Sequence, residues 1–77
     1  MRYPCRCCQY LTLTDKPPST FAICPVCWWE DDFPYNLDFV GASRVSLREA
    51  RANMQKFGAC EHRFIAKARP PTPEETP

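Results

Sequence analysis

The chain has 77 residues, six of them cysteine, and a formal net charge of +1. A chain this short forms one domain, and domains below about 70 to 80 residues seldom hold together on a hydrophobic core alone. The small net charge gives no overall attraction to nucleic acid or to an anionic membrane. No apolar stretch reaches the roughly 20 residues of a membrane span, and the N-terminus has no apolar secretory segment, so we expect a cytoplasmic protein without a membrane anchor.

Four of the cysteines form two C-x-x-C pairs, Cys5 with Cys8 and Cys24 with Cys27. The fifteen residues 9–23 separate the pairs, which lies in the spacing range of a four-cysteine zinc site. A C-x-x-C turn brings two thiolates of one tight loop to the same ion, and two such turns complete a tetrahedral shell. The spacing therefore predicts one Zn²⁺ bound by these four residues.

The segment between the pairs carries two short strand patterns. Residues 10–14, "YLTLT", alternate apolar and polar side chains, and residues 21–23, "FAI", form a second apolar run. The prolines and polar residues of "DKPPS" favour a turn between them. We predict a zinc-ribbon-like β-hairpin in which these two strands lie between the two C-x-x-C turns, or knuckles.

Three other chemistries use cysteines at such spacings. A disulfide framework needs an oxidising compartment. A redox pair at Cys24 and Cys27 would need the βαβ context of thioredoxin-like thiols. A zinc deaminase has P-C-x-x-C, as in Pro4 to Cys8, but also needs an upstream H-x-E segment, and only three residues precede Pro4 here. The deaminase is excluded, and the other two remain alternatives to the zinc site.

The segment 28–39, "WWEDDFPYNLDF", combines five aromatic residues with four carboxylates. Part of the aromatic set must cover the small core, and the rest are residue types that anchor protein interfaces. The carboxylates repel phosphate, so a partner surface here would be basic. The residues that we expect to contact a partner are Trp29, Glu30, Asp31, Asp32, Tyr35 and Asp38, whereas Trp28 is assigned to the core.

A helix is predicted at about residues 47–57. Ser46 stands three residues before Glu49 as in a capping box, and Gly58 follows the last helical residue. Apolar side chains recur at helical spacing and form one stripe for packing on the ribbon: Leu47, Ala50, Met54 and Phe57.

Three further residues are candidates for metal binding. Cys60 and His62 form a C-x-H pair that could bind the same ion or a second one, and Cys7 is a spare thiol beside the first pair. The alternative is that Cys60 is a small buried residue next to the helix end, near Phe57 and Phe64, as free cysteines often are.

The chain ends in the proline-rich run "RPPTPEETP", residues 69–77, which we expect to be a flexible tail. Residues 1–68 are then the folded part. The predicted fold class is a small α+β zinc-bound domain: a zinc-ribbon-like hairpin with two C-x-x-C knuckles, one packed C-terminal helix and the tail.

The chain resembles the bacterial cysteine-rich CPCC family, whose members contain "CPCCGY", "ICPVCFWEDD", a helix like "VSLxEARxN...FGAC" and a closing "RPP". The matching stretches are residues 5–10, 23–32, 41–60 and 69–71. Arg6 replaces the proline and Gln9 the glycine of the first motif, and neither change removes a sulfur. The resemblance implies a small zinc-binding protein. Such proteins also occur beside polymorphic toxins of the Rhs and type VI secretion kind, which implies an immunity role.

Two closed C-x-x-C pairs leave no open metal position, so we expect no enzyme activity. The expected function is that of an immunity protein that binds a cognate toxin domain through the acidic and aromatic segment, which suits a basic cleft. The alternative is a nucleic-acid-associated zinc-ribbon adaptor. Arg2, Arg6 and Lys16 are few cations for that role, so a nucleic-acid partner is not favoured.

Overall fold

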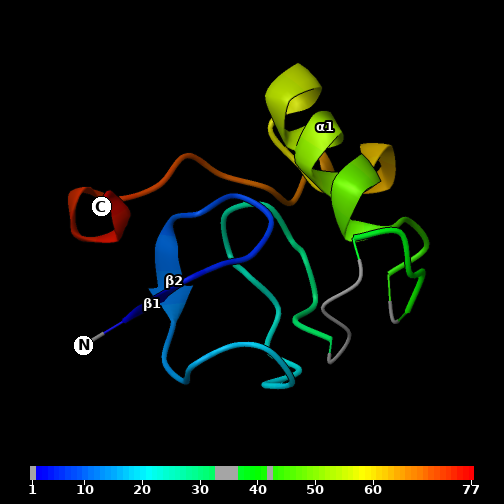
Figure 1. Cartoon of the computed structure of the whole chain (residues 1–77). Coiled ribbons are helices and arrows are strands. Elements are labelled where there is room, and N and C mark those ends of the chain that lie inside the picture. The colour runs from blue at the N-terminus through cyan, green and yellow to red at the C-terminus, as the bar shows by residue number, and fades with distance from the viewer. Residues whose placement is uncertain (1, 33–36, 42) are drawn as a thin grey trace.

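The computed structural model describes residues 2–32, 37–41 and 43–77. In chain order its elements are strands β1 (Tyr3–Pro4) and β2 (Leu11–Leu13), helix α1 (Leu47–Phe57) and the two 3₁₀ turns η1 (His62–Phe64) and η2 (Pro73–Glu75). Figure 1 shows the hairpin and the helix on opposite sides of two loops that meet in the middle. In the part of the chain described, no helix has the length and apolar character that crossing a bilayer requires.

The strand pairing differs from the predicted hairpin. β2 pairs antiparallel with β1, through Tyr3 with Leu13 and Pro4 with Leu11, so this hairpin encloses the first cysteine pair. Ile23 instead forms an isolated antiparallel bridge with Glu30, on either side of the second cysteine pair. The prediction that residues 10–14 pair with 21–23 was therefore wrong. Each C-x-x-C turn pairs its own flanking residues, because the turn reverses the chain and brings them together.

The predicted helix is confirmed at residues 47–57. The side chain of Ser46 accepts a hydrogen bond from the amide of Glu49, which satisfies one of the free donors of the first turn. At the other end Gly58 takes a left-handed conformation, with φ of 80°, and its amide donates to the carbonyl of Met54. Leu47 and Ala50 are buried, whereas Met54 and Phe57 are partly buried. The apolar stripe therefore enters the core mainly at its N-terminal half.

The core is built around the cysteines. Its buried members are Cys5, Cys7, Cys24, Val26, Cys27, Trp29, Leu47, Ala50 and Cys60. More than half of this set is cysteine, and the aliphatic part is small, as expected for a domain of this size. The aliphatic side chains alone therefore bury little apolar surface. A fold of this size needs a further source of stability, such as a metal ion held by the cysteines.

The C-terminal run is folded back on the hairpin. η2 contacts β2, and the Glu75 side chain is only 3% exposed, beside the guanidinium of Arg69. We expected a flexible tail at residues 69–77, whereas residues 69–75 make these specific contacts with the folded part. The physical reason is that Thr72, Pro73 and Glu75 form a short capped turn, which a composition rich in proline does not reveal.

Candidate metal centre

The first C-x-x-C pair lies at the tip of the β1–β2 hairpin. The amide of Cys5 donates to the carbonyl of Tyr10 at 2.9 Å, and the amide of Gln9 donates to the carbonyl of Cys5 at 2.8 Å. These two bonds close a tight loop that holds Cys5 and Cys8 on the same side of the turn. The loop of residues 5–10 is called knuckle 1 below.

The second pair has the same bonds, shifted by 19 positions from Cys5 to Cys24. The amide of Cys24 donates to the carbonyl of Trp29 at 2.9 Å, and the amide of Trp28 donates to the carbonyl of Cys24 at 2.8 Å. The flanking pairs are equivalent as well, since Ile23 with Glu30 repeats the pairing found around knuckle 1. Residues 24–29, knuckle 2, are therefore a second copy of the same local structure.

In both knuckles the residue after the second cysteine has a positive φ. The angle is 70° at Gln9 and 68° at Trp28. Side chains with a Cβ rarely adopt this left-handed conformation, which costs about 1–2 kcal/mol and favours glycine. Gln9, which stands where the family motif has glycine, therefore has a strained backbone in knuckle 1. Trp28 has the same strain in knuckle 2.

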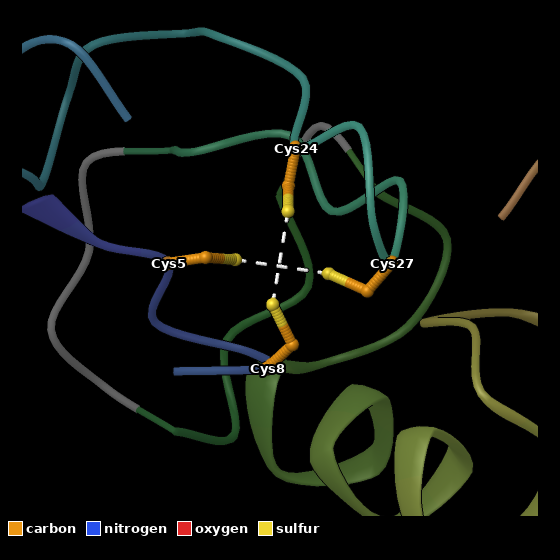
Figure 2. A group of neighbouring side chains, drawn as sticks. All are labelled: Cys5, Cys8, Cys24 and Cys27. Carbon is orange, nitrogen blue, oxygen red and sulfur yellow. Dashed lines mark hydrogen bonds between the residues drawn. The ribbon is translucent and has the colours of Figure 1, made fainter. Parts of the chain in front are cut away.

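The two knuckles face each other and bring four sulfurs together. The Sγ atoms of Cys5, Cys8, Cys24 and Cys27 all lie within 4.8 Å of one another. Cys5 Sγ is 3.7 Å from Cys27 Sγ, and Cys8 Sγ is 3.7 Å from Cys24 Sγ. Figure 2 shows the four side chains pointing at one centre, with each close contact joining one knuckle to the other. The predicted ligand residues are therefore grouped as a metal site requires.

The donor set fits a metal ion chemically. The thiols of Cys27, Cys5 and Cys8 surround Cys24, and their hydrogen bonds lower the pKa of Cys24. The same hydrogen bonding to Cys24 raises the pKa of the other three. Without a cation, only one of four sulfurs this close together ionises readily, because further thiolates would repel it. A divalent cation at the centre would allow all four to be thiolates.

Two polar groups outside the predicted ligand set support the sulfurs. The hydroxyl of Thr12, a buried residue of β2, lies 3.1 Å from Cys24 Sγ. The amide of Cys7 donates to Cys5 Sγ at 3.4 Å. Such donors stabilise thiolate charge and fix the orientation of ligand side chains. Sequence reasoning missed Thr12, because the alternation in "YLTLT" assigns it to the polar face of the strand, opposite Leu11 and Leu13.

The additional ligand candidates lie outside the sulfur group. Among the described residues, metal-ligating side chains gather in one group, made of the four knuckle cysteines. Cys60 is fully buried in the core, and Phe64 packs against that cluster. Burial raises the pKa of the Cys60 thiol to about 12, and the neighbouring Cys7 and Glu61 add to the rise. His62 is exposed and meets the ring of Phe57 edge-on at 5.7 Å.

The position of Cys7 follows from the repeat of the knuckles. Cys7 occupies the place in knuckle 1 that Val26 occupies in knuckle 2, and both are buried. This third position of the turn faces the core, whereas the first and fourth carry the converging sulfurs. Cys7 therefore packs as a small apolar residue. All six cysteines are free thiols, so the structure contains no disulfide framework.

Two of the predicted partner contacts are corrected by burial. Trp29 is 5% exposed and Asp31 is 1% exposed, so neither is accessible to a partner. They flank Glu30 in an extended segment, and alternate side chains of such a segment point to the same side. Asp31 Oδ2 accepts hydrogen bonds from the amide and hydroxyl of Thr20 at 2.9 and 2.7 Å. Asp31 is a structural residue of this turn.

The other predicted contact residues are partly buried, exposed or outside the described residues. Glu30 and Asp32 are partly buried, and Asp38 is exposed and pairs with Arg48 at 2.8 Å. Tyr35 lies outside the described residues. Trp28, which was assigned to the core, is only partly buried. Of the two tryptophans, Trp29 is the buried one, whereas Trp28 packs against the edge of the core.

Trp28 is held at the edge of the core by residues after α1. Its indole Nε1 donates to the carbonyl of Lys67 at 2.8 Å, and its ring lies 5.7 Å from that of Phe64. The ammonium of Lys67 is 5.0 Å from the centre of the indole. These contacts tie knuckle 2 to the C-terminal half of the chain and compensate for the strained φ of Trp28.

Gln9→Gly should stabilise the metal-loaded protein by about 0.5–1 kcal/mol. The change removes the strain of a positive φ, and the added freedom of glycine in the unfolded chain offsets part of the gain. Trp28→Gly removes equal strain but also the contacts with Phe64 and Lys67, so it should destabilise. Denaturant unfolding of the two variants checks this, and a destabilised Gln9→Gly would contradict the account of knuckle 1.

Cys7→Val and Cys60→Ala should each leave the metal content of the protein unchanged. The first copies Val26 into the equivalent place, and the second removes a buried thiol at a cost of roughly 1 kcal/mol. Cys24→Ala should abolish stable metal binding. Metal analysis after gel filtration distinguishes these outcomes. Loss of metal from either of the first two variants would require a new ligand assignment.

The geometry agrees with what the comparisons with known proteins show. A search of curated proteins finds no match to the chain. The family model described as cysteine-rich CPCC matches residues 3–75, which includes both knuckles, α1 and most of the folded C-terminal run. The chain belongs to the cysteine-rich CPCC family.

Proposed function

We propose that the chain binds one Zn²⁺ through Cys5, Cys8, Cys24 and Cys27, and that the zinc-bound domain is a non-catalytic interaction module. Its partner is a toxin domain, which it binds and neutralises as an immunity protein. The observation that carries the metal part is the convergence of four sulfurs from two knuckles. The partner part rests on the surface of the domain and on the role implied by the family resemblance.

The sulfur spacing supports zinc. Zinc–sulfur bonds are about 2.3 Å, so two sulfurs of a regular tetrahedron around zinc are about 3.8 Å apart. The two close pairs here are 3.7 Å apart. Zinc has no geometric preference of its own and is held in closed four-cysteine sites of this kind, where it contributes to folding.

The same shell argues against catalysis at the metal. A catalytic zinc keeps one position for water or substrate, whereas four thiolates fill a tetrahedron. Cys5, Cys24 and Cys27 are almost fully buried, and only Cys8 is partly exposed. When bound, the ion supplies a cross-link between the knuckles and neutralises thiolate charge.

Purified protein should contain one zinc per chain, and removing it with a chelator should unfold the domain. Structural zinc contributes on the order of 10 kcal/mol in small sites at neutral pH, which matches the whole stability of a small domain. Elemental analysis and circular dichroism test both points. A folded metal-free monomer, or a red protein that contains iron, would overturn the zinc assignment.

The contact face that we propose joins Asp32 to the loop of residues 37–41. Phe39 is 45% exposed and Val40 is 54% exposed. A Cβ placed on Gly41 would meet both the carboxylate of Asp32 and the ring of Phe39, so these two side chains lie close to each other. Asp38 adds a second carboxylate. An apolar pair with two carboxylates is complementary to a basic cleft with an apolar pocket.

The cations of the chain favour this reading over nucleic-acid binding. At least four of the ten lysine and arginine residues form ion pairs with carboxylates of the same chain. Arginines paired in this way contribute less to a phosphate-binding surface. The pair of Asp38 with Arg48 is exposed on both sides, so it is weak and can exchange for a partner cation.

If the neighbouring gene encodes a toxin domain, that domain is the probe for the partner proposal. Asp32→Asn with Asp38→Asn should weaken binding of that domain at least about tenfold at low salt, because two steering charges are lost without a change of shape. The matched control is Asp15→Asn with Glu74→Gln, which removes the same charge from exposed positions elsewhere. Calorimetry and survival of toxin-expressing cells provide the readouts.

Two outcomes contradict parts of this proposal. Equal binding by the acidic variant and its control would place the contact face elsewhere on the domain. A neighbouring gene that encodes no toxin domain, or a toxin domain that the wild-type protein does not bind, would overturn the immunity role and leave the zinc assignment standing.

A further inference from the structure

The C-terminal run crosses both knuckle hairpins. The amide of Arg69 donates to the carbonyl of Val26, in the tip of knuckle 2, at 3.2 Å. η2 then contacts β2, the strand that leaves knuckle 1. Figure 1 shows this segment, in orange and red, passing from the helix side of the molecule to the hairpin side. Residues 69–75, called the strap below, therefore bridge the two halves of the metal centre.

The strap is closed by one buried carboxylate. Both oxygens of Glu75 accept hydrogen bonds from Arg69, each at 2.9 Å, and Oε1 also accepts from the amide of Thr72 at 2.8 Å. Arg2, next to β1, adds a longer contact of 3.8 Å. A bidentate arginine–carboxylate pair is among the strongest and most directional side-chain contacts. Glu75 thus ties the strap to itself and to the N-terminal strand.

The ionisation of Glu75 follows from these contacts. The hydrogen bonds from Arg69 and then Thr72 lower the pKa of Glu75 to about 2. A carboxyl group whose pKa is lower in the folded state stabilises the fold above its unfolded pKa, and this stabilisation is lost as the pH falls through the folded pKa. The strap is therefore closed throughout the neutral range and does not respond to small pH changes there.

The strap bears on the sulfurs from two directions. Its Arg69 holds the backbone of Val26, which lies between the ligand residues Cys24 and Cys27. Its η2 turn backs β2, whose Thr12 hydroxyl contacts Cys24 Sγ at 3.1 Å. Opening the strap would break its bond to Val26 in knuckle 2 and its contact with β2, the strand whose Thr12 touches Cys24.

We propose that residues 69–75 act as a latch, closed by the Glu75–Arg69 pair, that limits how fast the metal thiolates exchange their ion or react with thiol reagents. This inference rests on the proposed metal site. A change in the C-terminal run that breaks the buried Glu75–Arg69 pair would then alter metal retention without touching a ligand residue.

Glu75→Gln tests the latch in the full chain. Losing the charge-assisted bonds to Arg69 should raise the rate of metal transfer to the chelator 4-(2-pyridylazo)resorcinol about tenfold, because the open form becomes more populated. The rate of reaction with Ellman's reagent should rise in parallel. Glu74→Gln is the matched control, since this neighbouring carboxylate is exposed, and its rates should stay within about twofold of wild type.

Glu75→Lys makes the test decisive, because it repels both Arg69 and Arg2. If this variant is folded and its two rates remain within about twofold of wild type, the latch is wrong. If it does not fold, the rates of Glu75→Gln decide. Should the wild-type protein bind no metal at all, the zinc proposal fails, while the thiol reaction rates of the same variants still show whether the strap protects the cysteines.

Discussion

Four thiol sulfurs within 4.8 Å of one another repel strongly once they ionise, and the fold is arranged around the point where they meet. The buried core contains few large aliphatic side chains, so it cannot by itself compensate for the entropy of ordering the chain. A cation at the centre would offset the repulsion of the thiolates and cross-link the two knuckles. Helix α1 packs Leu47 and Ala50 into the cluster that contains the cysteines, and the strand pairs flank the two knuckles. The strap bonds to the tip of knuckle 2.

The repeated knuckle explains why neighbouring residues have such different environments. In each copy the first and fourth positions carry converging sulfurs, the third faces the core, and the fifth takes a left-handed backbone. The geometry of this one unit therefore explains why Cys7 packs like Val26. It also explains why Trp29 is buried whereas Trp28 is only partly buried. Function at the surface has to use the residues that this unit leaves exposed, which include Phe39 and Val40 of the loop of residues 37–41.

The ligand residues and α1 could be predicted from the sequence because their signals are local. A C-x-x-C turn and a capped amphipathic stretch need no knowledge of distant residues. The strand pairing could not be predicted in the same way. The segments "YLTLT" and "FAI" are separated by only residues 15–20, which favours a hairpin between them, and composition does not show that each knuckle pairs its own flanking residues. Asp31 and Glu75 were misplaced for a related reason. Carboxylates are mostly exposed, and both are buried here only because specific donors, Thr20 and Arg69, meet them in the fold.

The self-contained bonding of each knuckle has a consequence for how related chains diverge. Residues 14–16, in the link between the two halves, are exposed, and the two backbone bonds that close each knuckle both lie within that knuckle. Lengthening such a link adds only a slowly growing entropy of loop closure. Insertions and deletions should therefore accumulate between the cysteine pairs and be rare within them. Relatives of this chain are better recognised by the internal pattern of each half than by the distance that separates them.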